Sequence, residues 1–247
     1  MKYRITVISD THTKEGYLVT PDEIRTSGQS PMLPGGDILI HAGDFMNSGY
    51  SQREAEEFFD WFDKIKGYDT KVFIAGNHDR KMQNDPETMR GLLTGYKTIE
   101  YLQDEAFGLY DMDEDRSLKF YGSPWQPEFY NWAFNLPRNG EELKAKWAAI
   151  PDYTEILITH GPAQGYLDTS GPPYNEPNLG CELLTKRIKE VKPKIHVCGH
   201  IHGGYGYMFD GDTHFFNASI LNERYEFRNK PMTFDWDRDT NEVTFVD

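Results

Sequence analysis

The chain has 247 residues, of which 26 are Lys or Arg and 40 are Asp or Glu, giving a formal net charge of −14. This length suits one domain with a sizeable core better than two, so we expect a single domain over residues 1–247. The acidic balance argues against an extended nucleic acid as a partner, because binding a polyphosphate backbone requires clustered Lys and Arg.

The N-terminal segment KYRITVISD predicts a strand rather than a secretory signal, since no basic start and apolar core precede a small-residue cleavage site. No apolar run approaches the roughly 18 residues that a membrane span needs, so no membrane partner is expected. Two cysteines, Cys181 and Cys198, are too few for a disulfide framework. We therefore expect a cytoplasmic protein, and the oligomeric state stays open, with a dimer as one option.

Short β-branched runs alternate with helical patterns along the chain, which favours an α/β fold. The strand-like runs lie at 3–9, 37–41, 71–75, 155–160, 194–199, 213–219 and 242–246, and the helical patterns at 51–67, 141–149 and 181–191. Ser51 and Glu54 predict a capping box at the start of the first helix, and Gly67 predicts its end. Cys181, at the start of the last helix, and Cys198, within a strand, are interpreted as buried structural residues.

Polar side chains follow five of the predicted strands, at the point where each strand ends. They are Asp10 and His12; Asp44; Asn77, His78 and Asp79; His160; and His200 and His202. Loops at the carboxyl ends of strands form the sites of open α/β sheets, so we expect these side chains to meet. Carboxylates, imidazoles and an amide carbonyl suit manganese, iron or zinc, and one bridging carboxylate would let them hold two cations. The pattern therefore predicts a dinuclear metal site suited to phosphoryl transfer.

Taken together, these motifs resemble those of the calcineurin-like metallophosphoesterases over nearly the whole chain. The motifs are Asp10-x-His12, Gly43-Asp44, Gly76-Asn77-His78-Asp79, His160-Gly161 and Gly199-His200-x-His202. The resemblance implies a four-layer α/β/β/α sandwich of two mixed β-sheets flanked by helices. It also implies one metal ion on Asp10, His12 and His202, a second on Asn77, His160 and His200, and Asp44 as the bridge between them. By the same likeness, His78 is a catalytic residue that faces the substrate phosphate and the leaving oxygen, and Asp79 orients its ring.

The segments YGSPWQPEFYNWAFNLPR, LITHGPAQGY and FFNAS are similar to the metallophosphoesterase-domain proteins of animal brain, which are grouped with class III cyclic-nucleotide phosphodiesterases. This likeness implies two divalent metal ions; manganese is the first expectation, with iron, zinc, nickel, cobalt and magnesium as alternatives. The implied function is hydrolysis of small phosphodiesters, cyclic nucleotides among them, by direct attack of a metal-bound hydroxide. The alternatives are a metal-dependent phosphomonoesterase or nucleotide pyrophosphatase, and a catalytically silent scaffold of the same fold.

The aromatic segment between residues 125 and 135 supports two interpretations. Trp125, Trp132 and Phe134 could stack a nucleobase or an aryl group of the substrate, as could Phe129 and Tyr130. Alternatively, these rings pin an irregular loop into the core. Asn135 is a candidate contact for the substrate phosphate or a cap for the turn, and the sequence leaves both interpretations open.

Overall fold

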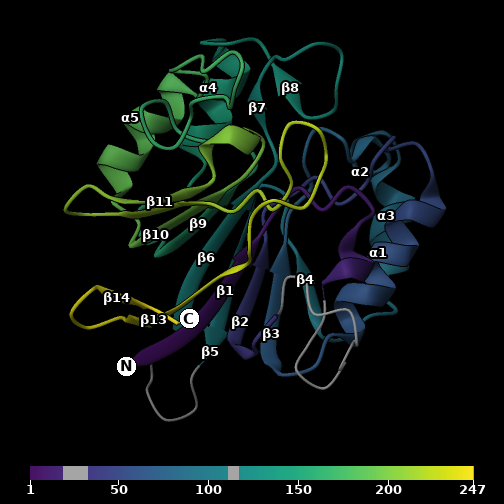
Figure 1. Cartoon of the computed structure of the whole chain (residues 1–247), viewed down its shortest axis with the longest axis horizontal. Helices are drawn as coiled ribbons and strands as arrows, with labels where there is room; N and C mark the ends of the chain where they lie inside the picture. Colours follow the sequence, from purple (N-terminus) through teal and green to yellow (C-terminus); the bar gives the residue numbers. More distant parts are fainter. Residues whose placement is uncertain (19–32, 111–116, 247) are drawn as a thin grey trace.

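The computed structural model describes residues 1–18, 33–110 and 117–246. Its strands form two six-stranded sheets and a short two-stranded pair (Figure 1). The first sheet has the order β14 (Glu242–Phe245), β13 (Met232–Asp237), β1 (Lys2–Ile8), β2 (Gly36–His41), β3 (Tyr68–Phe73) and β4 (Ile99–Tyr101). The second has the order β11 (Gly206–Phe209), β12 (His214–Asn217), β10 (Ile195–Cys198), β9 (Ile156–Thr159), β6 (Ser117–Ser123) and β5 (Glu105–Tyr110). The small pair is β7 (Gln126–Pro127) with β8 (Asn135–Leu136).

Both sheets are mixed, with parallel strands at the centre. In the first sheet β1, β2, β3 and β4 run parallel, and β13 and β14 pair antiparallel at one edge. In the second sheet β6, β9, β10 and β12 run parallel, and β5 and β11 are antiparallel edge strands. Parallel neighbours end at the same edge of their sheet, so the segments that follow β1, β2 and β3 lie together, as do those that follow β9 and β10.

Helices cover the outer face of each sheet (Figure 1). The helices α1 (Gln52–Lys64), α2 (Arg80–Asn84) and α3 (Pro86–Leu93) lie beside the first sheet, and α4 (Glu141–Ala148) and α5 (Glu182–Val191) lie beside the second. The period-two alternation of strands divides the core accordingly. In β9, Ile156 and Ile158 pack between the two sheets. Leu157 points to the opposite face and packs with the buried side chains of α4 and α5, Trp147 among them.

The predicted four-layer sandwich is therefore confirmed. Each predicted strand and helix exists with shifted ends, and Cys181 and Cys198 are buried as expected. The strands β4, β5, β6, β7, β8, β11 and β13, the helices α2 and α3 and the short 3₁₀ turns at Glu15–Tyr17 and His202–Gly204 add to the predicted set. Within the described part of the chain, no helix has both the length and the apolar character that crossing a membrane requires.

The predicted capping box at α1 is wrong. Ser51 is the N-cap residue of α1, but its side chain makes no capping hydrogen bond. The Glu54 carboxylate turns instead to the preceding loop, where it accepts hydrogen bonds from the Asn47 amide (3.1 Å) and the Ser48 hydroxyl (2.9 Å). The carboxylate thereby fixes the loop that follows β2. This loop also contains Asp44, a residue of the candidate site described next.

Candidate metal centre

The polar groups that follow five parallel strands meet where the two sheets adjoin. Ser9, directly after β1 in the first sheet, forms a bridge with Ser219, which follows β12 in the second. The Asp10 carboxylate lies at this junction and accepts hydrogen bonds from the Ser219 hydroxyl (2.8 Å) and the His200 amide (3.1 Å). Asp10 comes from one sheet and both donors come from the other, so this buried carboxylate joins the two halves of the site.

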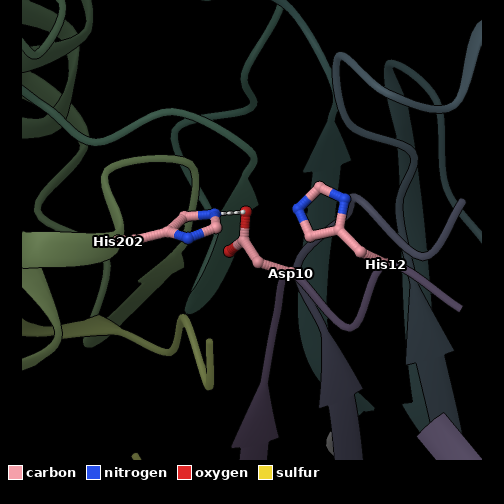
Figure 2. Close-up of side chains that lie close together, drawn as sticks. All are labelled: Asp10, His12 and His202. Atoms are coloured by element: carbon pink, nitrogen blue, oxygen red, sulfur yellow. Dashed lines mark ion pairs between the residues drawn. The ribbon is translucent and has the colours of Figure 1, made fainter. Parts of the chain in front are cut away.

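Three overlapping groups of side chains have ligand atoms within 4.8 Å of one another. Figure 2 shows the first, in which His202 and His12 flank Asp10 and the His202 Nε2 lies 3.3 Å from an Asp10 oxygen. The other two groups share Asp44 and consist of His12, Asp44 and His78, and of Asp44, His160 and His200. The Asn77 amide oxygen joins the last group, 3.0 Å from the His160 Nε2. The seven predicted ligands thus lie together. Asp44 links the group that contains His12 to the group that contains His160 and His200.

Backbone carbonyls orient four of the histidine rings in the same way. The Nδ1 atoms of His12, His160, His202 and His78 pair with the carbonyl oxygens of Met46 (3.2 Å), Ala42 (2.9 Å), Asn222 (2.9 Å) and Asn47 (2.7 Å), respectively. An Nδ1–H that donates to a carbonyl leaves Nε2 with a free lone pair, which is the form that binds a metal ion. The buried His12 Nε2 has no hydrogen-bond partner among the described residues. This unused acceptor beside two carboxylates fits a bound cation.

The charges of the site also favour cations. Burial alone would raise the pKa of Asp10 and of Asp44, but the neighbouring His202 and His160 outweigh burial and hold both pKa values below their usual range. The same pairing, acting against burial, raises the pKa of His202 and of His160 to about 9. Protons on these two imidazoles neutralise the buried carboxylates. Divalent ions would replace those protons, because metal binding to such ligands releases them.

Four of the seven predicted ligands have left-handed backbone conformations. The φ angles are +57° at Asp10, +44° at His12, +58° at Asp44 and +66° at His200. Asp and His tolerate this region better than most residues, but it still costs about 1 kcal/mol or more per residue. Such strain persists where the surrounding structure fixes the backbone, and here it occurs at four residues of the candidate metal-ligand groups.

Asp79 has a different partner from the one expected. Its two carboxylate oxygens accept hydrogen bonds from the backbone amides of Asp44 (2.9 Å), Met46 (2.8 Å) and Gly76 (2.6 Å). The carbonyl of Asn47, rather than Asp79, pairs with the ring of His78. The expectation that Asp79 orients this ring is therefore corrected: Asp79 ties together the loops that follow β2 and β3, which carry Asp44 and Asn77.

We expect Asp79→Ala to destabilise the protein rather than to impair the chemistry selectively. The substitution leaves three buried backbone amides without their acceptor, and each unsatisfied donor costs about 1–3 kcal/mol. Asp79→Asn keeps one acceptor oxygen and should lose less stability. Urea unfolding of both variants measures the effect. Native stability in Asp79→Ala, with a rate defect confined to esters of poor leaving groups, would instead restore the role of Asp79 in orienting His78.

The aromatic segment is anchored to the site. Trp132 stacks on the His78 ring at 4.1 Å, and the Ala133 amide donates to the Asn77 carbonyl (3.0 Å). Phe134 is fully buried, so its ring is closed to a ligand arriving from solvent. Trp125 packs edge-on against Phe134 and donates to Asp104 (2.8 Å).

The Asn135 side chain stabilises the turn at Phe129 and Tyr130. Its amide donates to the carbonyls of Phe129 and Tyr130, each at 2.9 Å, so it holds the turn that carries these two exposed rings. Substrate contacts by Trp125, Trp132 and Asn135 stay a prediction, whereas the burial of Phe134 contradicts the predicted contact of its ring with substrate.

A cavity of about 610 Å³ opens beside the metal-ligand groups. Its lining includes His200 and His202 and the aromatic residues Phe129, Tyr130, Tyr174 and Tyr225. Sequence reasoning missed Tyr174 and Tyr225. No motif marks either residue, and only the folded chain brings them to the site.

Comparison with known proteins supports both the family resemblance and the fold. The family model for the calcineurin-like phosphoesterases matches residues 3–204. Human metallophosphoesterase domain-containing protein 1 is 39% identical over 249 residues, which cover 94% of this chain and 70% of the human protein. Among solved structures, the protein TT1561 of Thermus thermophilus has a TM-score of 0.59 at 12% identity and covers 100% of this chain and 99% of its own. The phosphopantetheinyl hydrolase of Mycobacterium tuberculosis has a TM-score of 0.56 at 15% identity and covers 90% of each chain. These two structures support the fold alone.

Proposed function

The chain belongs to the calcineurin-like phosphoesterase family, and on that premise we propose that it hydrolyses small phosphodiesters, cyclic nucleotides among them. The observation that carries the choice of a diester is the charge of the cavity. Arg138 is the only Lys or Arg among the described residues of its lining. The guanidinium of Arg138 is already bonded to the Glu182 carboxylate (2.7 Å) and to the carbonyls of Gly180 (2.8 Å) and Leu179 (3.0 Å).

Carboxylates outnumber cations around the same cavity. Glu128, Glu176 and Glu223 line it together with Arg138. A phosphomonoester carries up to two negative charges at neutral pH, and a phosphodiester carries one. Because the described lining residues include no cation without an acidic or carbonyl partner, the dianion meets more repulsion than the monoanion. The cavity therefore favours the diester.

Two divalent ions, held by the seven side chains named above, would supply Lewis-acid chemistry, neutralising charge on the phosphoryl oxygens and acidifying water. The protein's own contribution is to place a proton donor beside them. The Nδ1 of His78 pairs with the Asn47 carbonyl and its ring lies against Trp132, so the Nε2 is left for the substrate. We assign the proton transfer to the imidazolium form of His78, which carries a proton on each nitrogen: Nδ1–H keeps its bond to the Asn47 carbonyl, and Nε2–H passes its proton to the leaving oxygen, which leaves a neutral ring.

The substrate class can be tested with two esters of the same leaving group. Protein loaded with Mn²⁺ should hydrolyse bis(p-nitrophenyl) phosphate faster than p-nitrophenyl phosphate, and it should open at least one of 2′,3′-cyclic AMP and 3′,5′-cyclic AMP. Release of p-nitrophenolate gives both aryl rates on one preparation, and chromatography detects the nucleotide product. A faster rate on the monoester would favour the phosphomonoesterase alternative, and no hydrolysis of any ester by metal-loaded protein would favour the silent scaffold.

A further inference from the structure

Two exposed aromatic rings contact different histidines of the candidate metal centre. Phe129 meets the His200 ring edge-on, with centroids 5.7 Å apart and planes at 84°. Tyr225 meets the His202 ring in the same way, at 5.6 Å and 76°, and the His12 ring at 4.7 Å and 80°. Phe129 thus lies against the group that contains Asp44 and His160, and Tyr225 lies against the group that contains Asp10.

Both rings are accessible and face one cavity. Phe129 is 49% exposed and Tyr225 is 37% exposed, and both line the space above His200 and His202. Ring surface left open to water at a concave, polar site is a common mark of ligand binding. A flat aromatic group fits between such rings better than a short alkyl group, because it stacks on them.

The loops that carry these rings are fixed before any ligand arrives. Asn135 donates to the carbonyls of Phe129 and Tyr130, as described above, and accepts a hydrogen bond from the Gln126 amide (3.1 Å). On the other side, Tyr225 has a left-handed backbone (φ +58°), and its amide donates to the Asn222 carbonyl (2.8 Å).

The Asn222 loop also serves the metal centre. The same Asn222 carbonyl pairs with the His202 Nδ1, and the Lys14 ammonium donates to the Tyr225 carbonyl. The Asn222 carbonyl therefore supports both the Tyr225 turn and the His202 ring, which fixes the place of Tyr225 relative to the candidate ligands.

The two rings differ in their distance from the proton donor. Tyr225 lies 6.2 Å from the His78 ring between centroids, whereas the ring neighbours of Phe129 are Tyr130 and His200. If His78 serves the leaving oxygen, the leaving group lies on the Tyr225 side. The group that stays on phosphorus then lies on the Phe129 side.

We infer that Phe129 selects phosphodiesters whose retained ester group is a flat aromatic, such as a nucleobase-bearing or aryl group, and that Tyr225 contacts the leaving group. This inference rests on the proposed phosphodiesterase function. It makes Phe129 and Tyr225 specificity-determining residues for different ends of the substrate.

The test uses two diesters with the same leaving group and different retained groups, bis(p-nitrophenyl) phosphate and methyl p-nitrophenyl phosphate. In Phe129→Ala, the ratio of kcat/KM for the aryl over the methyl diester should fall about tenfold, mainly through a higher KM for the aryl diester. In Tyr225→Ala, kcat/KM should fall for both diesters alike, and the ratio should stay at the wild-type value. Phe129→Trp, which restores a ring, should recover the ratio.

Phe209→Ala is the matched control, because Phe209 is a similarly exposed ring on β11 outside the cavity lining. It should leave both rates unchanged. Metal content and circular dichroism of each variant show whether the centre and the fold are retained. An unchanged ratio in folded, metal-loaded Phe129→Ala overturns the inference, as does a ratio that moves only in Tyr225→Ala. If the wild type hydrolyses neither diester, the proposed function itself fails, which is a separate result.

Discussion

His78→Ala is expected to keep both metal ions and to lose about 10²–10⁴-fold in hydrolysis rate, the usual contribution of general acid–base assistance. The loss should be largest for diesters with poor leaving groups, because an alkoxide must be protonated as it departs and p-nitrophenolate hardly needs a proton. A series of diesters with leaving groups of rising pKa, assayed alongside metal analysis by mass spectrometry, measures both effects.

The experiment separates two roles for His78, proton donor and metal ligand. The second role is open because ligand atoms of His78, His12 and Asp44 lie within 4.8 Å of one another. If His78 binds a metal ion, the Ala variant should lose about one ion and slow all diesters by the same factor. Asn77→Ala is the matched comparison from the adjacent position. Its amide oxygen contacts His160, so its removal should lower metal content, and the resulting defect should not depend on the leaving group.

Chelation should abolish hydrolysis, and Mn²⁺ should restore it. Protein saturated with metal should contain close to two transition-metal ions per chain, since the predicted ligands form overlapping groups in which Asp44 links His12 to His160 and His200. The ions should also raise the melting temperature, because they bind the folded chain and neutralise its buried carboxylates. Full activity in a metal-free preparation would contradict both the centre and the proposed function.

The two metal positions can be separated with His200→Gly. His200 lies in the group with Asp44 and His160, so its loss should lower the content to about one ion and leave the ion at Asp10 and His12 in place. His214→Gln is a suitable control. This buried histidine lies on β12, and its ring pairs with the Tyr207 hydroxyl (2.8 Å) and the Asn241 carbonyl (2.8 Å), outside the three groups.

The clustering of the candidate ligands could be predicted from sequence because each lies shortly after the end of a buried strand. Asp10, Asp44 and Asn77 follow parallel neighbours in one sheet, and His160 and His200 follow parallel neighbours in the other. A motif that follows a predicted parallel strand is therefore enough to locate its side chains at the shared edge of the sheet.

Contacts made through loops could not be predicted in this way. The partner of the His78 ring is the backbone carbonyl of Asn47, and every residue has such a carbonyl, so residue type gives no signal. Glu54 has the spacing of a capping box, but the loop after β2 takes its carboxylate. Tyr225 reaches the centre through a left-handed turn far along the chain from the motifs, and its sequence carries no mark of that proximity.

The Asp10 junction between the sheets also sets the order in which the centre can be assembled during synthesis. Asp10 and the His200 amide that bonds it are 190 residues apart, and the Ser219 hydroxyl comes later still. At about 5–20 residues per second, the ribosome needs about 10–40 s to reach His200 after Asp10. The group of Asp10, His12 and His202 is complete only once His202 has emerged, so metal loading of this group should follow synthesis of the segment that carries His202. The ions would then enter a site whose two sheets have already met.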